Sequence, residues 1–169
     1  DSEFLLTSDL VCHGVPSPKA FNIFLKAIEK QKDIQIIQYK FRDKTINGWN
    51  CSSSTIISIN NKNRKIKKIH YTPIQNAYFK AFINGALNRE CCYKCKFTTE
   101  KRVSDITLAD FWGINMFSKK FHCDYGVSLI IINSDKGENT FDHIKNTITL
   151  QESTYEQAKV VNKCLYKST

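Results

Sequence analysis

Short apolar or alternating runs along the chain predict six β-strands, and polar turn residues separate them. The clearest run is residues 126–133, where Val127, Leu129 and three consecutive isoleucines predict a fully buried strand. The expected strands are residues 4–12, 34–41, 49–59, 66–71, 106–111 and 126–133. Asn60 to Asn63 reads as the turn of a hairpin between two of them.

Helical spacing of apolar residues occurs in four other segments. Phe21, Phe24 and Ile28 follow the i, i+3, i+7 pattern of a core-facing helix, with Ser17 as N-cap and Pro18 as first residue. Further helices are expected from Pro73 and over residues 140–146 and 155–166, and residues 134–137 are expected to form a turn. The pattern predicts an α/β (α+β) fold, with a mixed sheet covered by at least three helices and a cysteine-bearing loop.

The length of 169 residues favours a single domain over residues 1–169. A composition with 41% hydrophobic and 24% charged residues excludes disordered and coiled-coil classes. No apolar run approaches the roughly 20 residues that span a bilayer, and no signal peptide is apparent, so a cytoplasmic protein is expected. Because the sequence begins at Asp1 without a methionine, we expect it to be a fragment of a longer protein.

The charge balance is strongly basic, with 25 Lys and Arg against 16 Asp and Glu, a net charge of +9. This suits an anionic partner, although a solubilising surface explains it as well. The densest basic run consists of Lys62, Arg64, Lys65, Lys67 and Lys68. On a hairpin these side chains could contact phosphates. Without interleaved aromatic residues, however, an edge strand protected by lysines is the favoured interpretation.

The chain has seven cysteines, an odd number, whereas a secreted disulfide framework favours an even number at regular spacing in a shorter chain. A reducing compartment is therefore expected. Cys92-x-x-Cys95 has the spacing that lets two thiolates converge on a metal or cluster. A redox pair or two packed thiols remain alternatives. Cys12 is the last residue of an expected strand and on its own would be a core cysteine. Asp105 and Asp110 lie five positions apart around another apolar strand. Asp110 could cap a turn, neutralise a cation or hydrogen-bond a ligand, and turn capping is the default role.

Several motifs follow one another in a fixed order, at residues 9–18, 41–44, 48–49, 92–97, 102–113, 126–128 and 133–137. Together they resemble the C-terminal domain of the coenzyme F-420 hydrogenase/dehydrogenase beta-subunit family. The resemblance spans nearly the whole chain, and the ordered combination is more specific than any single motif. One departure is Ala109, where the family usually has glycine.

The resemblance implies an oxidoreductase that uses FAD and a [4Fe-4S] cluster, passing electrons between a ferredoxin-like donor and a hydride-accepting coenzyme or substrate. Cys12, Cys92 and Cys95 match three cluster ligands, and we expect their thiols to lie close together. The fourth ligand and much of the flavin site belong to the region that precedes this domain in the family. Both cofactors are therefore expected to be absent or incomplete in this chain alone. No catalytic or flavin-contacting residue is assigned.

The expected partner is a ferredoxin-like donor or an N-terminal ferredoxin module. Binding to a membrane or to nucleic acid is not expected. The main alternative is a zinc-stabilised nucleic-acid-binding module that uses Cys92, Cys95 and either His122 or Cys123. A cofactor-free interaction domain is a third possibility. Under the cluster hypothesis four cysteines are dispensable, namely Cys51, Cys91, Cys123 and Cys164.

Overall fold

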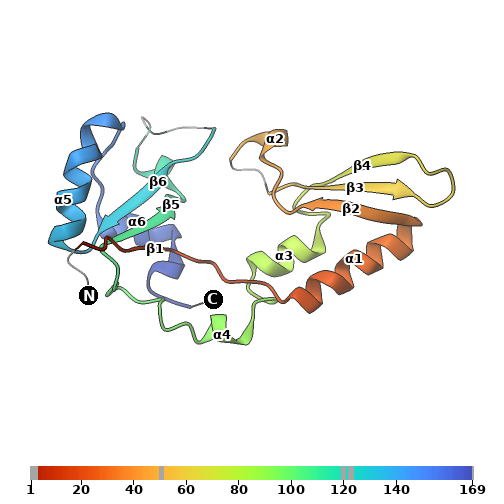
Figure 1. The fold of residues 1–169 in the computed structure, drawn as a ribbon, viewed down its shortest axis with the longest axis horizontal. Coiled ribbons are helices and arrows are strands. Elements are labelled where there is room, and N and C mark those ends of the chain that lie inside the picture. The colour runs from red at the N-terminus through yellow and green to blue at the C-terminus, as the bar shows by residue number, and fades with distance from the viewer. Residues whose placement is uncertain (1–3, 50–51, 119–120, 122–123, 169) are drawn as a thin grey trace. The chain divides into compact units, whose positions relative to one another are not determined.

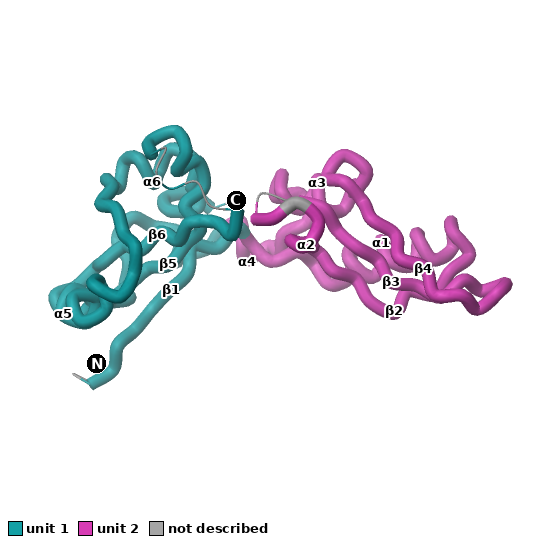
Figure 2. The backbone as a smooth tube through the Cα atoms, turned by 90° about the horizontal axis from the view of Figure 1, so that it is seen from above, with its two compact units in different colours: residues 1–13, 94–169 teal, residues 14–93 magenta. Residues whose placement is uncertain are grey.

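The computed structural model describes residues 4–49, 52–118, 121 and 124–168. It divides into two compact units, shown in different colours in Figure 2. We call residues 1–13 and 94–169 the terminal unit and residues 14–93 the central unit. Each unit contains a three-stranded sheet and helices, which confirms the expected α+β class.

The sheet of the terminal unit has the strand order β1-β5-β6, with β1 parallel and β6 antiparallel to the central β5 (Figure 1). Its strands are β1 (Ser8–Leu10), β5 (Ile106–Asp110) and β6 (Ser128–Ile132). The expectation of buried strands at residues 4–12 and 126–133 is wrong in both length and burial. Leu10 is 65% exposed and Ile132 is 38% exposed. Both strands lie at sheet edges, where less of each side chain is covered.

The two α-helices described in the terminal unit begin at side-chain caps. Ser134 accepts a hydrogen bond from the Gly137 N–H, so residues 134–137 start a helix, and the turn expected there is wrong. Thr154 and Gln157 form a capping box at the next helix. The elements are α5 (Asp135–Ile144), α6 (Tyr155–Val161) and the 3-10 helices η1 (Ile114–Met116), η2 (Lys145–Thr147) and η3 (Lys163–Leu165). The buried core consists of Phe111, Ile114, Leu129, Ala158 and Leu165.

The central unit contains the antiparallel sheet β2-β3-β4 (Figure 1). Its strands are β2 (Ile34–Lys40), β3 (Ser54–Asn60) and β4 (Ile66–Tyr71). The predicted hairpin between β3 and β4 is confirmed. The Asn60 side chain accepts hydrogen bonds from the N–H groups of Lys62 and Asn63, and Arg64 adopts the left-handed conformation that closes the turn.

The helices of the central unit are α1 (Pro18–Lys32), α2 (Lys44–Asn47), α3 (Ala77–Ile83) and α4 (Glu90–Tyr93). α1 begins at Pro18, as the sequence predicts. α3 does not begin at Pro73, because the Asn76 side chain accepts the Phe79 N–H at 2.9 Å and sets the first turn there. α1 contributes Ile28 to a core that also contains Ile34 and Ile56.

Aromatic rings join α1, α3 and β2 on one face of this sheet. Phe24 of α1 stacks on Tyr78 of α3 with ring centroids 5.0 Å apart, and both α1 and α3 rings contact neighbours on β2 or just beyond it. Edge-to-face and stacked ring contacts of this kind add to the stabilisation that comes from burying the rings. The cluster consists of Phe21, Phe24, Tyr39, Phe41, Tyr78, Phe79 and Phe82.

A buried carboxylate ties α2 to the sheet of the central unit. The hydroxyls of Thr45 and Thr55 each donate to Asp43 at 2.6 Å, and these bonds lower its pKa from 3.8 to about 2. The Thr55 hydroxyl also lies 2.9 Å from His70 Nδ1 on β4. Asp43 is therefore a structural anchor for the segment between β2 and β3.

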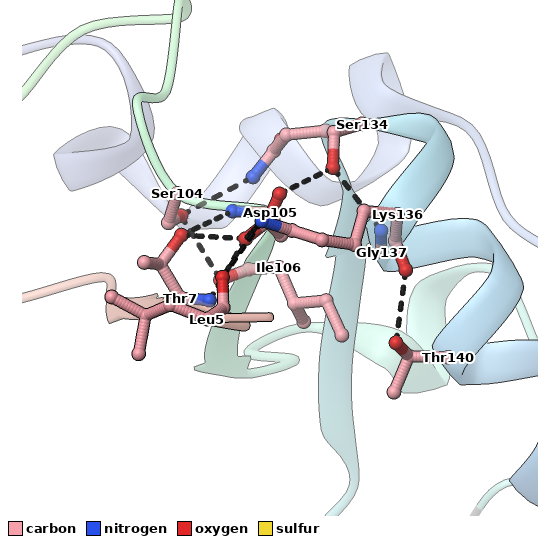
Figure 3. A network of polar contacts seen from close by, with 10 residues as sticks. Leu5, Thr7, Ser104, Asp105, Ile106, Ser134, Lys136, Gly137 and Thr140 are labelled. Carbon is pink, nitrogen blue, oxygen red and sulfur yellow. Dashed lines mark hydrogen bonds and ion pairs between the residues drawn. The ribbon is translucent and has the colours of Figure 1, made fainter. Parts of the chain in front are cut away.

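Asp105 plays the corresponding role in the terminal unit (Figure 3). The N–H and hydroxyl of Thr7 both donate to its Oδ2 at 2.8 Å, and the Ser134 hydroxyl donates to its Oδ1 at 2.6 Å. The Lys136 ammonium lies 3.3 Å from the same carboxylate. These contacts, the Ser134 bond foremost, hold the pKa of Asp105 well below its usual range.

Among the described residues, every helix is too short or too polar to cross a bilayer.

Candidate metal centre

Cys12 lies where β1 ends, in the terminal unit. The Val11 N–H donates to the Leu108 carbonyl at 2.9 Å, which extends the pairing with β5 up to the residue before the cysteine. Cys12 itself is exposed and follows directly. Because β1 and β5 run parallel, Cys12 leaves the sheet at the same edge as the end of β5 at Asp110. A regular scaffold thus presents this thiol at the protein surface.

The segment after Cys12 and His13 belongs to the central unit and is fixed by backbone bonds. The Val15 carbonyl accepts the Arg89 N–H at 2.9 Å, and the Ser17 N–H donates to the Leu87 carbonyl at 2.8 Å. Gly14 has φ +119°, and a Cβ there would overlap the Asn88 side chain. Glycine is therefore required at this close approach.

Cys92 is the cysteine that this segment contacts. The Val15 N–H donates to Cys92 Sγ at 3.4 Å, across 77 residues of sequence. Cys92 lies in the short helix α4, and the Tyr93 hydroxyl anchors that helix by donating to the Gly85 carbonyl at 2.6 Å. A backbone N–H aimed at a sulfur stabilises negative charge on it. The sequence places this pair of cysteines in a loop, and the structure forms one helical turn at the first of them.

Cys95 belongs to the terminal unit and has the chemistry of a thiolate. The Thr98 hydroxyl hydrogen-bonds to its sulfur and is the main cause of a pKa below the ordinary value of a thiol. The N–H groups of Phe97 and Thr98 and the charge of Arg102 act in the same direction. Thiolates are the form that binds metal, so this half-buried side chain is prepared for ligation.

Arg102 holds the segment that follows Cys95. Its guanidinium is 5% exposed, pairs with Asp9 of β1 at 3.5 Å and donates to the Phe97 carbonyl at 3.0 Å. It also reaches the Leu165 carbonyl at 3.4 Å, near the end of the chain. Arg102 Nε and Asp9 Oδ1 are buried without a hydrogen-bond partner among the described residues. One cation therefore connects β1, the segment after Cys95 and η3.

The structure brings Cys92 to Val15, and Cys95 to Thr98 and Arg102. Cys12 and Cys95 belong to one unit and Cys92 to the other, so the expected convergence of the three thiols stays a prediction. Within each unit, the described residues contain no group of three Cys, His, Asp or Glu side chains placed to hold a metal.

The other cysteines have different settings. Cys91 is exposed beside Cys92, and Cys164 is half-buried. Cys51 and Cys123 lie outside the described residues, as does His122, so the zinc ligands proposed as an alternative are not described as a set.

Sequence reasoning identified the cysteines but missed the groups that bond to them. Four cationic residues, Lys94, Lys96, Lys101 and Arg102, lie in or soon after the C-x-x-C motif, and Arg102 is among the groups that lower the pKa of Cys95. The spacing Cys95-x-x-Thr98 was the available signal for the hydroxyl, since a turn brings the fourth residue back to the first. Nothing in the sequence indicates the Val15 contact to Cys92.

Comparison with protein families gives one match. Residues 1–158 match the family model that describes the C terminus of the beta subunit of coenzyme F-420 hydrogenase/dehydrogenase. Comparison with the curated proteins and with the solved structures gives no match. The family match covers the β1 end with Cys12 and both cysteines of the C-x-x-C motif.

Proposed function

The chain belongs to the coenzyme F-420 hydrogenase/dehydrogenase beta-subunit family, and we propose that it acts in a flavin- and iron–sulfur-dependent oxidoreductase. Membership supports the oxidoreductase role directly, because hydrogenases and dehydrogenases transfer electrons. The proposed reaction passes electrons from a ferredoxin-like donor to a hydride-accepting coenzyme or substrate. The observation that carries the proposal is the match over residues 1–158.

The proposed ligands of a [4Fe-4S] cluster are Cys12, Cys92 and Cys95. Their chemistry fits, because thiolate sulfur is the donor that iron–sulfur clusters take and that magnesium and calcium do not. The low pKa of Cys95 favours its charged form, and the Val15 N–H donates a hydrogen bond to Cys92 Sγ. When bound, the cluster supplies one-electron transfer and FAD supplies the exchange between single electrons and hydride.

The residues around the sulfurs stabilise negative charge and fix position. Arg102 contributes positive charge at Cys95 while its bonds to Asp9 and to the Phe97 carbonyl hold the segment in place. At Cys92 the sulfur accepts a hydrogen bond from the Val15 N–H, a neutral donor that brings no net charge. Hydrogen bonds and charge near the sulfurs are the protein's means of setting a reduction potential.

Serine replacements in the full-length protein, purified without oxygen, test the ligand set. We expect Cys12→Ser, Cys92→Ser and Cys95→Ser each to reduce iron and acid-labile sulfide and to weaken the broad visible absorbance of the cluster. Cys91→Ser is the matched control, since it changes an exposed neighbour of Cys92, and Cys164→Ser is a second. Loss of iron from Cys91→Ser with retention by Cys92→Ser would contradict the assignment.

Metal identity separates this proposal from the zinc alternative. A brown-yellow protein that contains iron, sulfide and FAD supports the oxidoreductase. A colourless protein that contains zinc held by the same cysteines would overturn it. Full-length protein that is properly folded but contains neither metal would do so too.

A further inference from the structure

The β3–β4 hairpin has an unusual charge. Residues 54–71 contain five Lys and Arg and no Asp or Glu, and all five cationic side chains are exposed. Two carboxylates at the adjoining end of α1, Glu29 and Asp33, are bound to the Ile36 N–H and the Asn61 amide. The hairpin is therefore a positively charged projection of the central unit.

β4 ends the sheet and offers a regular edge. Its pairing with β3 runs without a shift from Ser54 opposite Tyr71 to the far end. The Asn60 N–H donates to the Lys65 carbonyl at 3.0 Å, which makes this pair a hydrogen-bonded one. Bonded and non-bonded pairs alternate along antiparallel strands, so the backbone groups of the residues at 66, 68 and 70 point away from β3. Among the described residues they have no bonding partner.

The opposite edge of the same sheet is closed. β2 has a bulge between Ile36 and Gln38, and the Glu29 carboxylate accepts the Ile36 N–H at 2.8 Å. A bulge and a bonded carboxylate both prevent a further strand from pairing. β4 has neither device, and only its lysines discourage pairing.

A shallow groove runs beside the β4 edge to the end of α1. Side chains alternate between the two faces of a strand, so Lys67 and Lys68 carry positive charge on opposite faces. Ile66 is 73% exposed at the start of the strand. The groove is lined by Lys32, Ile34, Asn60, Lys67, Lys68, Ile69 and His70.

We propose that the β4 edge binds an extended acidic segment of another protein as a fourth strand. The backbone groups that face outward supply the ladder bonds, and the lysines pair with Asp or Glu on both faces of the added strand. A second copy of this chain is disfavoured, because β4 against β4 would oppose lysines to lysines. Nucleic acid lacks the alternating donors and acceptors that an edge strand pairs with, and no exposed Phe, Tyr or Trp ring lies on the hairpin for base stacking.

Two octapeptides of equal charge test the proposal with the whole chain. One, the Glu-Thr peptide, repeats Glu-Glu-Thr-Thr and so places carboxylates on both faces of an added strand. The other replaces each Thr by Pro, which cannot donate ladder bonds. We expect the Glu-Thr peptide to bind more tightly and to slow amide hydrogen exchange at Ile66, Lys68 and His70. Equal binding of both peptides would show that charge alone accounts for the affinity, and it would overturn strand addition. Binding of neither would also overturn it.

Charge reversal locates the site. Lys67→Glu combined with Lys68→Glu should weaken binding of the Glu-Thr peptide roughly tenfold, because attractive cross-strand pairs become repulsive. Lys19→Glu combined with Lys26→Glu makes the same change in net charge on exposed positions of α1 and should leave binding intact. Equal loss in both variants would contradict the location. Tighter binding of a single-stranded oligothymidylate than of the Glu-Thr peptide would assign the surface to nucleic acid.

Discussion

Single polar side chains hold distant segments of the terminal unit together. Asp105 binds Thr7, which precedes β1, and Ser134, which caps α5. Arg102 likewise connects Asp9 of β1 with the Leu165 carbonyl of η3. Such contacts join residues about 30 to 100 positions apart, and no local pattern announces them. The sequence therefore assigned no role to Asp105, and its long-range partners are established only in the folded chain.

The Asp105 contacts make a pH-dependent contribution to stability. The pKa of this carboxyl is lowered on folding, mainly by the Ser134 hydroxyl, so the contribution is present above its ordinary pKa of 3.8 and is lost as pH falls below that value. We expect Asp105→Asn to lower the melting temperature by several degrees at pH 7. The difference from the unsubstituted protein should shrink below about pH 4 in thermal unfolding followed by circular dichroism.

Asp142→Asn is the control for this effect. It removes an exposed carboxylate whose contact is the neighbouring Lys145 on the protein surface, at 2.8 Å. Surface ion pairs of this kind contribute little. An equal change in melting temperature for the two variants would show that the Asp105 contacts contribute no more to stability than a surface ion pair.

At the scale of elements, the sequence correctly predicted the helices and turns that depend only on nearby residues. The stripe of Phe21, Phe24 and Ile28 places α1 correctly, and the asparagine turn places the β3–β4 hairpin. The start of α5 was missed, because Ser134-x-x-Gly137 fits a turn and a helix cap equally well. The bond from Ser134 to Asp105 favours the cap, and that contact is tertiary.

Gly137 provides a test of this tertiary control. Helix propensity alone predicts that Gly137→Ala stabilises α5 by roughly 1 kcal/mol. A Cβ at this position would, however, overlap the backbone carbonyl oxygen of Asp105. We expect a net loss of roughly 2 kcal/mol in the free energy of unfolding, as overpacked sites show. Asn139→Ala, at an exposed position of the same helix, should be close to neutral in denaturant unfolding. Stabilisation by Gly137→Ala would contradict the close approach.

At the scale of the whole molecule, the order of motifs identified the family, and the match over residues 1–158 confirms it. The α+β class also followed from the sequence. The division into two compact units did not, because strands that belong to different sheets have the same local pattern. The same limit applies to the three thiols: spacing relates Cys92 to Cys95, whereas only the resemblance relates either of them to Cys12.

The last prediction concerns the 169-residue chain by itself. Its three proposed ligands, Cys12, Cys92 and Cys95, leave a [4Fe-4S] cluster one thiolate short, and cluster stability depends on a full ligand set. We expect the chain purified without oxygen to contain fewer than four irons and four sulfides. Its fold should persist after chelation, because Ile56 and Leu165 are fully buried in cores that contain no metal ligand. Iron and sulfide analysis with circular dichroism before and after chelation measures both. Four irons per chain would place a fourth ligand inside it, with Cys91 and Cys123 the first candidates.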